Sequence, residues 1–221
     1  MTTRRKRRNA ERAEKVKPIT AKTPNQKGYI RSIIENEITF CCGPAGSGKS
    51  FVAAGIAANH LHKGQVSRII VTRPLVCTGK DIGALPGELD EKIAPYLTPM
   101  QENLRFFLGQ SYYGHYNNEG KLNYEPLEVM RGATFHDSYM ILDEAQNCTF
   151  EQIKMFITRM GEDSKIIING DINQSDIRGL SGLEQCMDRL EGVLGVGVCE
   201  LDHSDIQRNG ILGRVLDALE S

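Results

Sequence analysis

Residues 43–50 carry the clearest chemical signal in this chain of 221 residues. They match the pattern GxxxxGK[ST] at every fixed position, with the residues Gly43, Pro44, Ala45, Gly46, Ser47, Gly48, Lys49 and Ser50. Glycines let the backbone curl until successive N–H groups point into one concavity that binds phosphate. In this pattern the lysine reaches the β- and γ-phosphates, and the serine hydroxyl ligates Mg²⁺. The stretch therefore predicts a nucleoside-triphosphate site in which Lys49 binds phosphate and Ser50 binds the metal.

Two adjacent acidic residues, Asp143 and Glu144, follow the apolar run at residues 139–142. A carboxylate at the end of a strand beside the phosphate loop can hold Mg²⁺ through the water shell of the ion. A second carboxylate can polarise a water molecule for attack on a phosphoryl group. Asp143 is therefore the predicted metal residue, and Glu144 predicts hydrolysis of the nucleotide rather than its storage.

A third apolar run, residues 165–169, ends in a polar stretch that contains Gln174. The carboxyl ends of parallel strands converge on one crevice, so Gln174 is expected to hydrogen-bond the γ-phosphate or the attacking water. Asp171 and Asp176 allow two interpretations, because aspartate also stabilises turns and helix starts. The sequence leaves both aspartates open between a site role and a turn role.

The elements that position these residues alternate between strand and helix. Short β-branched and apolar runs predict strands at residues 38–42, 68–72, 139–142, 165–169 and 196–201. Helices are predicted at residues 49–62, roughly 88–108, 150–160 and 181–190. Runs that are apolar on successive residues are typical of strands covered on both faces, and the alternation implies right-handed crossovers. The predicted fold class is therefore α/β, a three-layer sandwich with a mainly parallel sheet, and the glycine- and tyrosine-rich residues 109–123 are expected to form an exposed loop.

Composition indicates a soluble globular protein. Apolar residues make up 40% of the chain and charged residues 25%, an ordinary balance for this class. No run of 18 apolar residues occurs, which excludes a membrane-spanning helix. The six cysteines contain no CxxC pair and several lie in apolar runs, so we expect reduced thiols and a cytoplasmic location.

Positive charge is concentrated at the N-terminus, although the net charge of the whole chain is −1. Residues 1–17 hold eight Lys or Arg against two Glu. Such a segment has too few apolar groups to fold alone, so residues 1–22 are expected to be a disordered basic tail that precedes a domain at residues 23–221. The tail could bind nucleic acid through phosphate contacts, or it could keep the chain soluble. Both interpretations stay open.

Together, these motifs resemble the PhoH-like ATPase family. Beyond the phosphate loop, the resemblance rests on short segments in a fixed order: Thr23-Pro-Asn-Gln26, Thr72-Arg-Pro74, Leu85-Pro-Gly87, Pro95-Tyr-Leu-Thr-Pro99, Met130-Arg-Gly132 and Ile141-Leu-Asp-Glu-Ala-Gln-Asn147. It covers about 200 residues, essentially the whole chain after the basic tail. The resemblance implies a RecA-like core related to the first motor domain of superfamily 1 helicases, with ATP and Mg²⁺ as its ligands.

The resemblance also implies roles for residues outside the phosphate loop. Gln26 matches a position that reads the adenine base. Arg73 matches a position at which related motors contact nucleic acid, with a structural ion pair as an equal alternative. Arg208 is retained in a C-terminal stretch that otherwise departs from the family pattern, and it implies a guanidinium that neutralises charge in the transition state. Arg131 and Arg159 match the family without an implied role.

The length of the chain suits one RecA-like domain, whereas superfamily 1 motors hydrolyse ATP between two. We therefore expect a homo-oligomer, with a ring such as a hexamer as the natural geometry, in which each subunit supplies Arg208 to the γ-phosphate of its neighbour. The expected activity is ATP hydrolysis coupled to RNA or single-stranded DNA. The alternative is an ATP-dependent switch or assembly module that acts on a protein partner.

Overall fold

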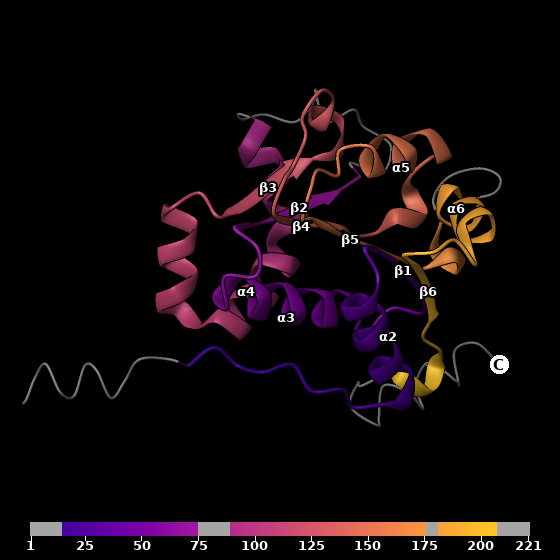
Figure 1. The fold of residues 1–221 in the computed structure, drawn as a ribbon, viewed down its shortest axis with the longest axis horizontal. Coiled ribbons are helices and arrows are strands. Elements are labelled where there is room, and N and C mark those ends of the chain that lie inside the picture. The colour runs from indigo at the N-terminus through magenta and orange to yellow at the C-terminus, as the bar shows by residue number, and fades with distance from the viewer. Residues whose placement is uncertain (1–14, 75–88, 176–180, 207–221) are drawn as a thin grey trace, which may run out of the picture.

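A computed structural model describes residues 15–74, 89–175 and 181–206 of the chain (Figure 1). Within these residues, six strands form one sheet in the order β3-β2-β4-β5-β1-β6, and all neighbouring pairs are parallel. The strands are β1 (Ile38–Cys42), β2 (Arg68–Arg73), β3 (Leu122–Pro126), β4 (Ser138–Leu142), β5 (Lys165–Gly170) and β6 (Val196–Glu200). The phosphate loop follows β1, which lies inside the sheet between β5 and β6.

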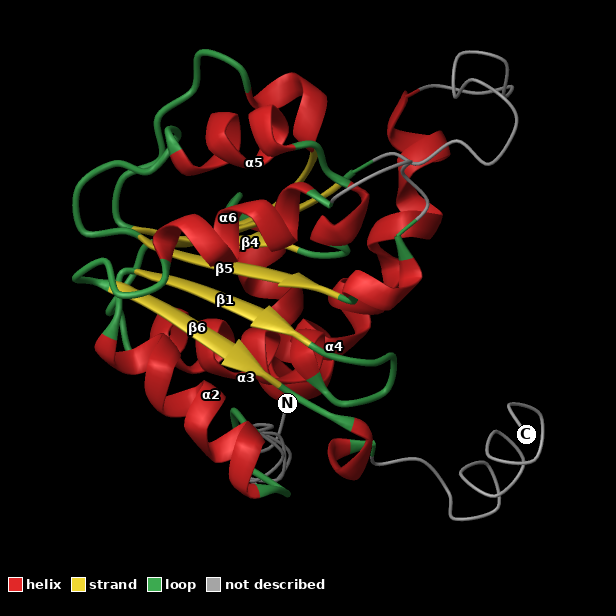
Figure 2. Ribbon diagram, turned by 90° about the vertical axis from the view of Figure 1, so that its right-hand side faces the viewer, coloured by secondary structure: helices red, strands yellow, loops and turns green. Residues whose placement is uncertain are grey.

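Helices cover both faces of this sheet (Figure 2). They are α2 (Pro24–Glu35), α3 (Lys49–His62), α4 (Leu89–Asn118), α5 (Phe150–Ile157) and α6 (Gly182–Leu190). Helices α2, α3 and α4 lie on one face, and α5 and α6 lie on the other. The prediction of an α/β three-layer sandwich with a parallel sheet is confirmed. No described helix combines the length and the apolar character that crossing a bilayer requires.

The strands are buried on both faces, which explains their uninterrupted apolar runs. In β2, Ile69 and Val71 pack on the side of α2, α3 and α4, whereas Ile70 packs on the side of α5 and α6. All residues of β4 are buried. Burial of one such aliphatic side chain stabilises the fold by about 1.5–3 kcal/mol. The sheet is therefore a rigid support for the loops at its carboxyl edge.

Residues 110–118 are helical and β3 begins at Leu122, so the prediction of an exposed loop over residues 109–123 is wrong. Helix α4 continues past Gly109, whose φ of 72° and ψ of 160° break the helical path and redirect the chain. Glycine adopts a positive φ without steric cost. Tyr113 and Tyr116 lie one turn apart and are buried against the core, with exposed fractions of 7% and 9%. The composition suggested a surface loop, but a kink explains the glycine and core packing explains the tyrosines.

Residues 15–22, named here the N-terminal strap, lie against the domain, although they were expected to belong to a disordered tail. They contain no helix or strand, and they run beneath α3 towards α2 in Figure 1. The N–H of Lys17 donates to the carbonyl of Phe107 over 2.8 Å, and Ile19 packs on the core. The strap therefore belongs with the domain, whereas residues 1–14 lie outside the described residues.

Candidate active site

The phosphate loop joins β1 to the N-terminus of α3, which is the context that the motif requires. Gly46 and Gly48 have φ values of 84° and 95°, in a region that side chains other than glycine rarely adopt. At Gly43, a Cβ atom would lie 2.5 Å from the carbonyl oxygen of Leu201. Helix α3 begins at Lys49 without a side chain that caps its first N–H groups. Its positive end is therefore available to an anion.

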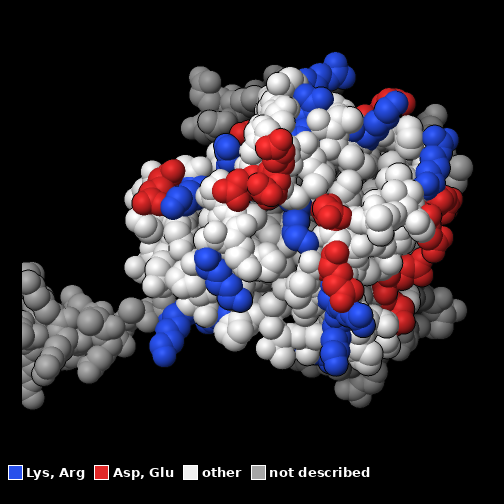
Figure 3. All heavy atoms as spheres, viewed as in Figure 1, with Lys and Arg blue, Asp and Glu red and all other residues white. Residues whose placement is uncertain are grey.

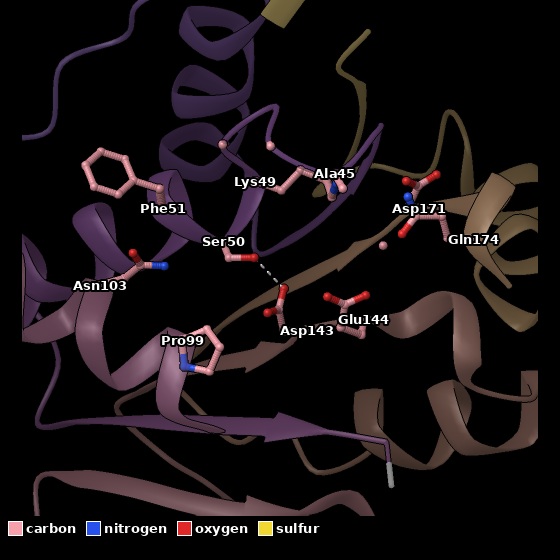
Figure 4. Close-up of a pocket in the computed structure, with 13 residues that line it drawn as sticks. Ala45, Lys49, Ser50, Phe51, Pro99, Asn103, Asp143, Glu144, Asp171 and Gln174 are labelled. Atoms are coloured by element: carbon pink, nitrogen blue, oxygen red, sulfur yellow. Dashed lines mark hydrogen bonds between the residues drawn. The ribbon is translucent and has the colours of Figure 1, made fainter. Parts of the chain in front are cut away.

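A pocket of about 290 Å³ opens at this loop, on the carboxyl edge of the sheet (Figure 4). Strands β4, β5 and β1 are neighbours in the sheet, and the segments that follow them line the pocket. The predicted residues that line it are Ala45, Gly46, Gly48, Lys49, Ser50, Asp143, Glu144 and Gln174. The remaining loop residues Gly43, Pro44 and Ser47 do not line it. Ser47 is buried, and its hydroxyl donates to the Pro44 carbonyl over 2.8 Å.

Ser50 and Asp143 meet inside the pocket, where the hydroxyl donates to Asp143 Oδ1 over 2.8 Å (Figure 4). Burial raises the pKa of the Asp143 carboxyl, and the neighbouring Glu144 raises it further. The hydrogen bond from Ser50 and the charges of Arg73 and Lys49 oppose this shift. A hydroxyl and a buried carboxylate fit Mg²⁺, which prefers oxygen ligands and would offset the buried charge. No group of three or more His, Cys, Asp or Glu side chains able to hold a metal occurs in the described part of the chain.

Glu144 is held by side chains from two other positions. Its φ of 57° and ψ of 40° are left-handed, which costs a non-glycine residue about 1–2 kcal/mol. Its Oε1 lies 3.3 Å from Nη2 of Arg73, the last residue of β2. Its Oε2 accepts a hydrogen bond from Nε2 of Gln146 over 2.6 Å. Of the two interpretations of Arg73, the structure contains the ion pair, and the partner is the predicted catalytic glutamate.

Gln146 is a site residue that the sequence reasoning did not identify. Its side chain is buried, and in addition to its bond with Glu144 its Oε1 accepts from the N–H of Asp171 over 3.0 Å. The amide therefore ties the segment after β4 to the segment after β5. At Gly170, a Cβ atom would lie 2.9 Å from Gln146 Oε1, so glycine allows this close approach. The motif at residues 141–147 marked the segment, but the bridge depends on β4 and β5 being neighbours.

Three more pocket residues, Phe51, Pro99 and Asn103, also escaped the sequence reasoning. Phe51 follows Ser50 on α3, and its ring centroid lies 4.6 Å from that of Phe107 on α4. Helix α4 thereby forms one side of the pocket. Apolar periodicity predicted most of this helix, but it does not reveal which of its polar residues lies beside the loop.

Lys49 extends along its own loop, where its Nζ donates to the carbonyls of Gly43 and Pro44. Gln174 lies in the short helix η4 (Ile172–Gln174) and is exposed. Asp171 accepts a hydrogen bond from the N–H of Asn173 over 3.2 Å, as a turn residue would, and it also lines the pocket, so both interpretations of this aspartate stay open. Asp176 lies outside the described residues.

Gln26 lies behind the loop rather than in the pocket. Its Nε2 donates to the carbonyl of Ser47 over 2.8 Å, and its Oε1 accepts from the N–H of Lys22 in the strap over 2.9 Å. A smaller hollow of about 190 Å³ beside it is lined by Gln26, Phe51 and strap residues. Each polar end of the amide has one partner within the chain and keeps a second N–H or lone pair with which it could bind an adenine base.

The other arginines differ in their surroundings. Arg159 donates from Nη1 to the carbonyl of Ala133 over 3.2 Å, which is a structural contact. Arg131 is exposed at the end of the short helix η2 (Leu127–Met130). Arg208 lies outside the described residues.

A glycine-rich loop between a central parallel strand and a helix, with an acidic pair at the end of a nearby strand, defines a P-loop nucleoside-triphosphate-binding domain. Both the loop geometry and the strand order meet this definition. The chain belongs to the PhoH-like protein family, whose model, described as PhoH-like protein, matches residues 18–220. The family that the motifs resembled is thereby confirmed.

Individual relatives agree with this assignment. The PhoH-like protein of Bacillus subtilis (strain 168) is 41% identical over 208 residues, which are 93% of this chain and 65% of that protein. The PhoH-like protein of Mycobacterium tuberculosis (strain ATCC 25618 / H37Rv) is 42% identical over 204 residues, 91% of this chain and 58% of that protein. Protein PhoH of Escherichia coli (strain K12) is 42% identical over 205 residues, with the same two coverages. The chain thus spans less than two thirds of the length of these relatives.

Two helicases are among the solved structures that align with this chain. The UvsW helicase from bacteriophage T4 aligns with a TM-score of 0.49 at 13% identity, over 89% of this chain and 67% of that chain. The Pif1 helicase from Candida albicans aligns with a TM-score of 0.45 at 13% identity, over 91% of this chain and 44% of that chain. At these identities the similarity concerns the fold alone.

Proposed function

We propose that this protein is a cytoplasmic ATPase that uses Mg²⁺ and couples hydrolysis to RNA or single-stranded DNA as a homo-oligomer. One observation carries the nucleotide part: Lys49, Ser50, Asp143, Glu144 and Gln174, from segments after three neighbouring strands, line one pocket at the open N-terminus of α3. The cysteines in the described residues are all free, as expected of a reducing compartment.

Each residue has a defined task in the proposed reaction. The loop N–H groups and the N-terminus of α3 bind the phosphates, and Lys49 exchanges its bonds to loop carbonyls for bonds to phosphate oxygens. Ser50 and Asp143 would hold Mg²⁺, which neutralises phosphate charge when it is bound. Glu144 accepts a proton from water as the water oxygen bonds to the γ-phosphorus and the bond from that phosphorus to ADP breaks. Gln174 orients the water or the γ-phosphate.

A groove beside the pocket supports the strand part of the proposal. It has a volume of about 490 Å³ and is lined by Lys15, Lys17, Arg105 and Phe106, together with the acidic Glu102. Phe106 is 48% exposed, and its ring centroid lies 3.8 Å from the Lys17 ammonium. Cations for phosphates and a ring for stacking are the features that sequence-independent strand binding uses. Basic and acidic side chains are mixed over the face in Figure 3, so the lining of the groove, rather than a large patch of one charge, supports this assignment.

Self-association with Arg208 acting on a neighbouring site is the third part of the proposal. The short helix η5 (His203–Asp205) precedes this arginine in the sequence. The carboxylate of Asp205 is fully buried and accepts hydrogen bonds from Thr23 Oγ1 and Asn25 Nδ2, which anchors this segment to the N-terminus of α2. An arginine from a neighbour would add positive charge at the γ-phosphate. Sedimentation with ATP and Mg²⁺ tests this part, and full hydrolysis by a monomer would exclude it.

Steady-state ATP hydrolysis, measured with and without oligo(U) or oligo(dT), tests the activity itself. Lys49→Ala should abolish ATP binding, and Glu144→Gln should lower kcat by about 10²–10⁴-fold while ATP still binds. Lys63→Ala, just past the far end of α3, and Glu151→Gln, at the exposed start of α5, are matched controls that should keep the wild-type rate. A wild-type rate in Glu144→Gln would refute the proposal. Hydrolysis that ignores both strands would favour a switch that acts on a protein partner.

A further inference from the structure

The ion pair between Arg73 and Glu144 joins two neighbouring strands at the edge of the pocket. Arg73 ends β2 and Glu144 follows β4, which pairs with β2 in the sheet. In addition to its contact with Glu144 at 3.3 Å, the guanidinium donates from Nη1 to the carbonyl of Tyr96 over 3.1 Å. Arg73 does not line the pocket, whereas Glu144 does. The arginine therefore acts on the pocket through the glutamate.

Both carboxylate oxygens of Glu144 have partners in this arrangement. Oε1 faces Arg73 and Oε2 accepts from Gln146. The oxygen that is to take a proton from water must turn one of its lone pairs towards that water. A guanidinium on one oxygen and a buried amide on the other restrain this rotation. The side chain of Glu144 is thus fixed by two contacts, of which at least one must yield for the carboxylate to turn.

The two contacts differ in how accessible they are. The side chains of Arg73 and Glu144 are 26% and 37% exposed, whereas Gln146 is only 2% exposed. Ion pairs with this degree of exposure are weak, because water and salt screen them. A phosphate group offers a guanidinium two parallel charge-assisted hydrogen bonds, which are stronger. Arg73 is therefore the contact that an anion from solution can remove.

We propose that Arg73 restrains Glu144, and that a phosphodiester group of a bound RNA or single-stranded DNA draws Arg73 away and frees Glu144 to activate water. Arg73 is thus a positioning residue that couples strand binding to hydrolysis. This inference rests on the proposed ATPase function. The γ-phosphate of ATP carries the same chemistry as a phosphodiester, so the test compares saturating ATP with and without a strand.

The test is the initial rate of ATP hydrolysis by the full chain with Arg73→Ala, with and without oligo(U). Without a strand, kcat should rise several-fold towards the strand-stimulated wild-type value, and oligo(U) should raise it no further. The KM for ATP should stay unchanged, because Arg73 lies outside the pocket lining. Arg73→Lys keeps the charge but loses the planar fork, so it should show an intermediate basal rate and a reduced stimulation. Arg68→Ala, which removes the same charge at the opposite end of β2, should behave as wild type.

Several results would overturn the inference. One is a kcat of Arg73→Ala without a strand that is lower than that of wild type. Another is stimulation of Arg73→Ala by oligo(U) to the same degree as wild type. The third is a wild-type protein that hydrolyses ATP at the same rate with and without oligo(U). Arg73→Gln, which keeps a donor for the Tyr96 carbonyl, provides the same comparison if the alanine variant does not fold. If Glu144→Gln retains the wild-type rate, the proposed function falls together with this inference. If Glu144→Gln is inactive and Arg73→Ala gives one of the contrary results, only the inference falls.

Discussion

Replacement of Asp143 by asparagine is expected to stabilise the protein without nucleotide and to remove its stabilisation by ATP and Mg²⁺. Only 8% of Asp143 is exposed, and burial raises the pKa of its carboxyl above the ordinary value. The folded protein therefore disfavours the charged form of this side chain. Asparagine keeps the shape and an acceptor for the Ser50 hydroxyl, which lies 2.8 Å from Asp143 Oδ1, and it carries no charge.

The pH dependence of this effect follows from the direction of the pKa shift. A carboxyl whose folded pKa is raised contributes stability below its unfolded pKa, near 3.9, and loses that contribution as the pH rises through the folded value. Asp143 therefore lowers wild-type stability at neutral pH relative to acid pH. The advantage of Asp143→Asn should be about 1 kcal/mol at pH 7, the usual size for a stabilising substitution, or about 2–4 °C in Tm for a chain of this size, and should vanish near pH 4.

Nucleotide should reverse this ranking. At 100 times Kd, a ligand stabilises the folded state by about 2.7 kcal/mol, which corresponds to about 5–11 °C in Tm. Wild type should show this rise with ATP and Mg²⁺, whereas Asp143→Asn should show little of it. Scanning calorimetry at pH 7 and pH 4 measures both effects, with the exposed Asp188→Asn on α6 as the control. If Asp143→Asn without nucleotide melts below wild type at pH 7, the bond from Ser50 outweighs the cost of burial and the reasoning is refuted.

Three further changes test other contacts. Gly170→Ala would place a Cβ atom 2.9 Å from both the backbone nitrogen and Oε1 of Gln146. This substitution should lower the free energy of unfolding, measured in urea, by about 1–3 kcal/mol, and it should reduce ATP hydrolysis. Tyr29→Phe removes the hydroxyl that donates to Asn169 Oδ1 over 2.6 Å and leaves that buried amide unpaired. The free energy of unfolding should therefore fall by about 1–3 kcal/mol, and an unchanged urea midpoint would contradict this. Lys17→Ala should reduce the salt slope of oligonucleotide binding, measured by fluorescence anisotropy, by about one, and an unaltered slope would place the strand elsewhere.

Most of the sheet could be predicted because buried parallel strands form uninterrupted apolar runs. The five predicted strands match β1, β2, β4, β5 and β6 to within one residue at each end. Strand β3 was missed because it is a partly exposed edge strand whose five residues include Asn123 and Glu125. The last third of α4 was missed because Gly109 interrupts its helical pattern.

The candidate site could be predicted where a residue belongs to the phosphate-loop motif or follows an apolar strand. Spacing within one loop identified Lys49 and Ser50, and position at a strand end identified Asp143 and Glu144, all of which line the pocket. The contact of Arg73 with Glu144 depends on the order of strands in the sheet, which spacing does not encode. The same limit applies to Gln146 and to the residues that α4 contributes.

The contacts of Gln146 limit which amino acids this position can accept. The side chain must donate at one end to Glu144 and accept from the N–H of Asp171 at the same time. The backbone carbonyl of Gln146 accepts from the hydroxyls of Ser175 and Ser181, which does not depend on the side chain. Asparagine is one methylene too short, ionised glutamate cannot donate, and lysine cannot accept. Each of these three replacements therefore loses at least one of the two side-chain bonds. The position is thus constrained by the two segments that it joins, although the side chain itself touches neither nucleotide nor metal in the proposed reaction.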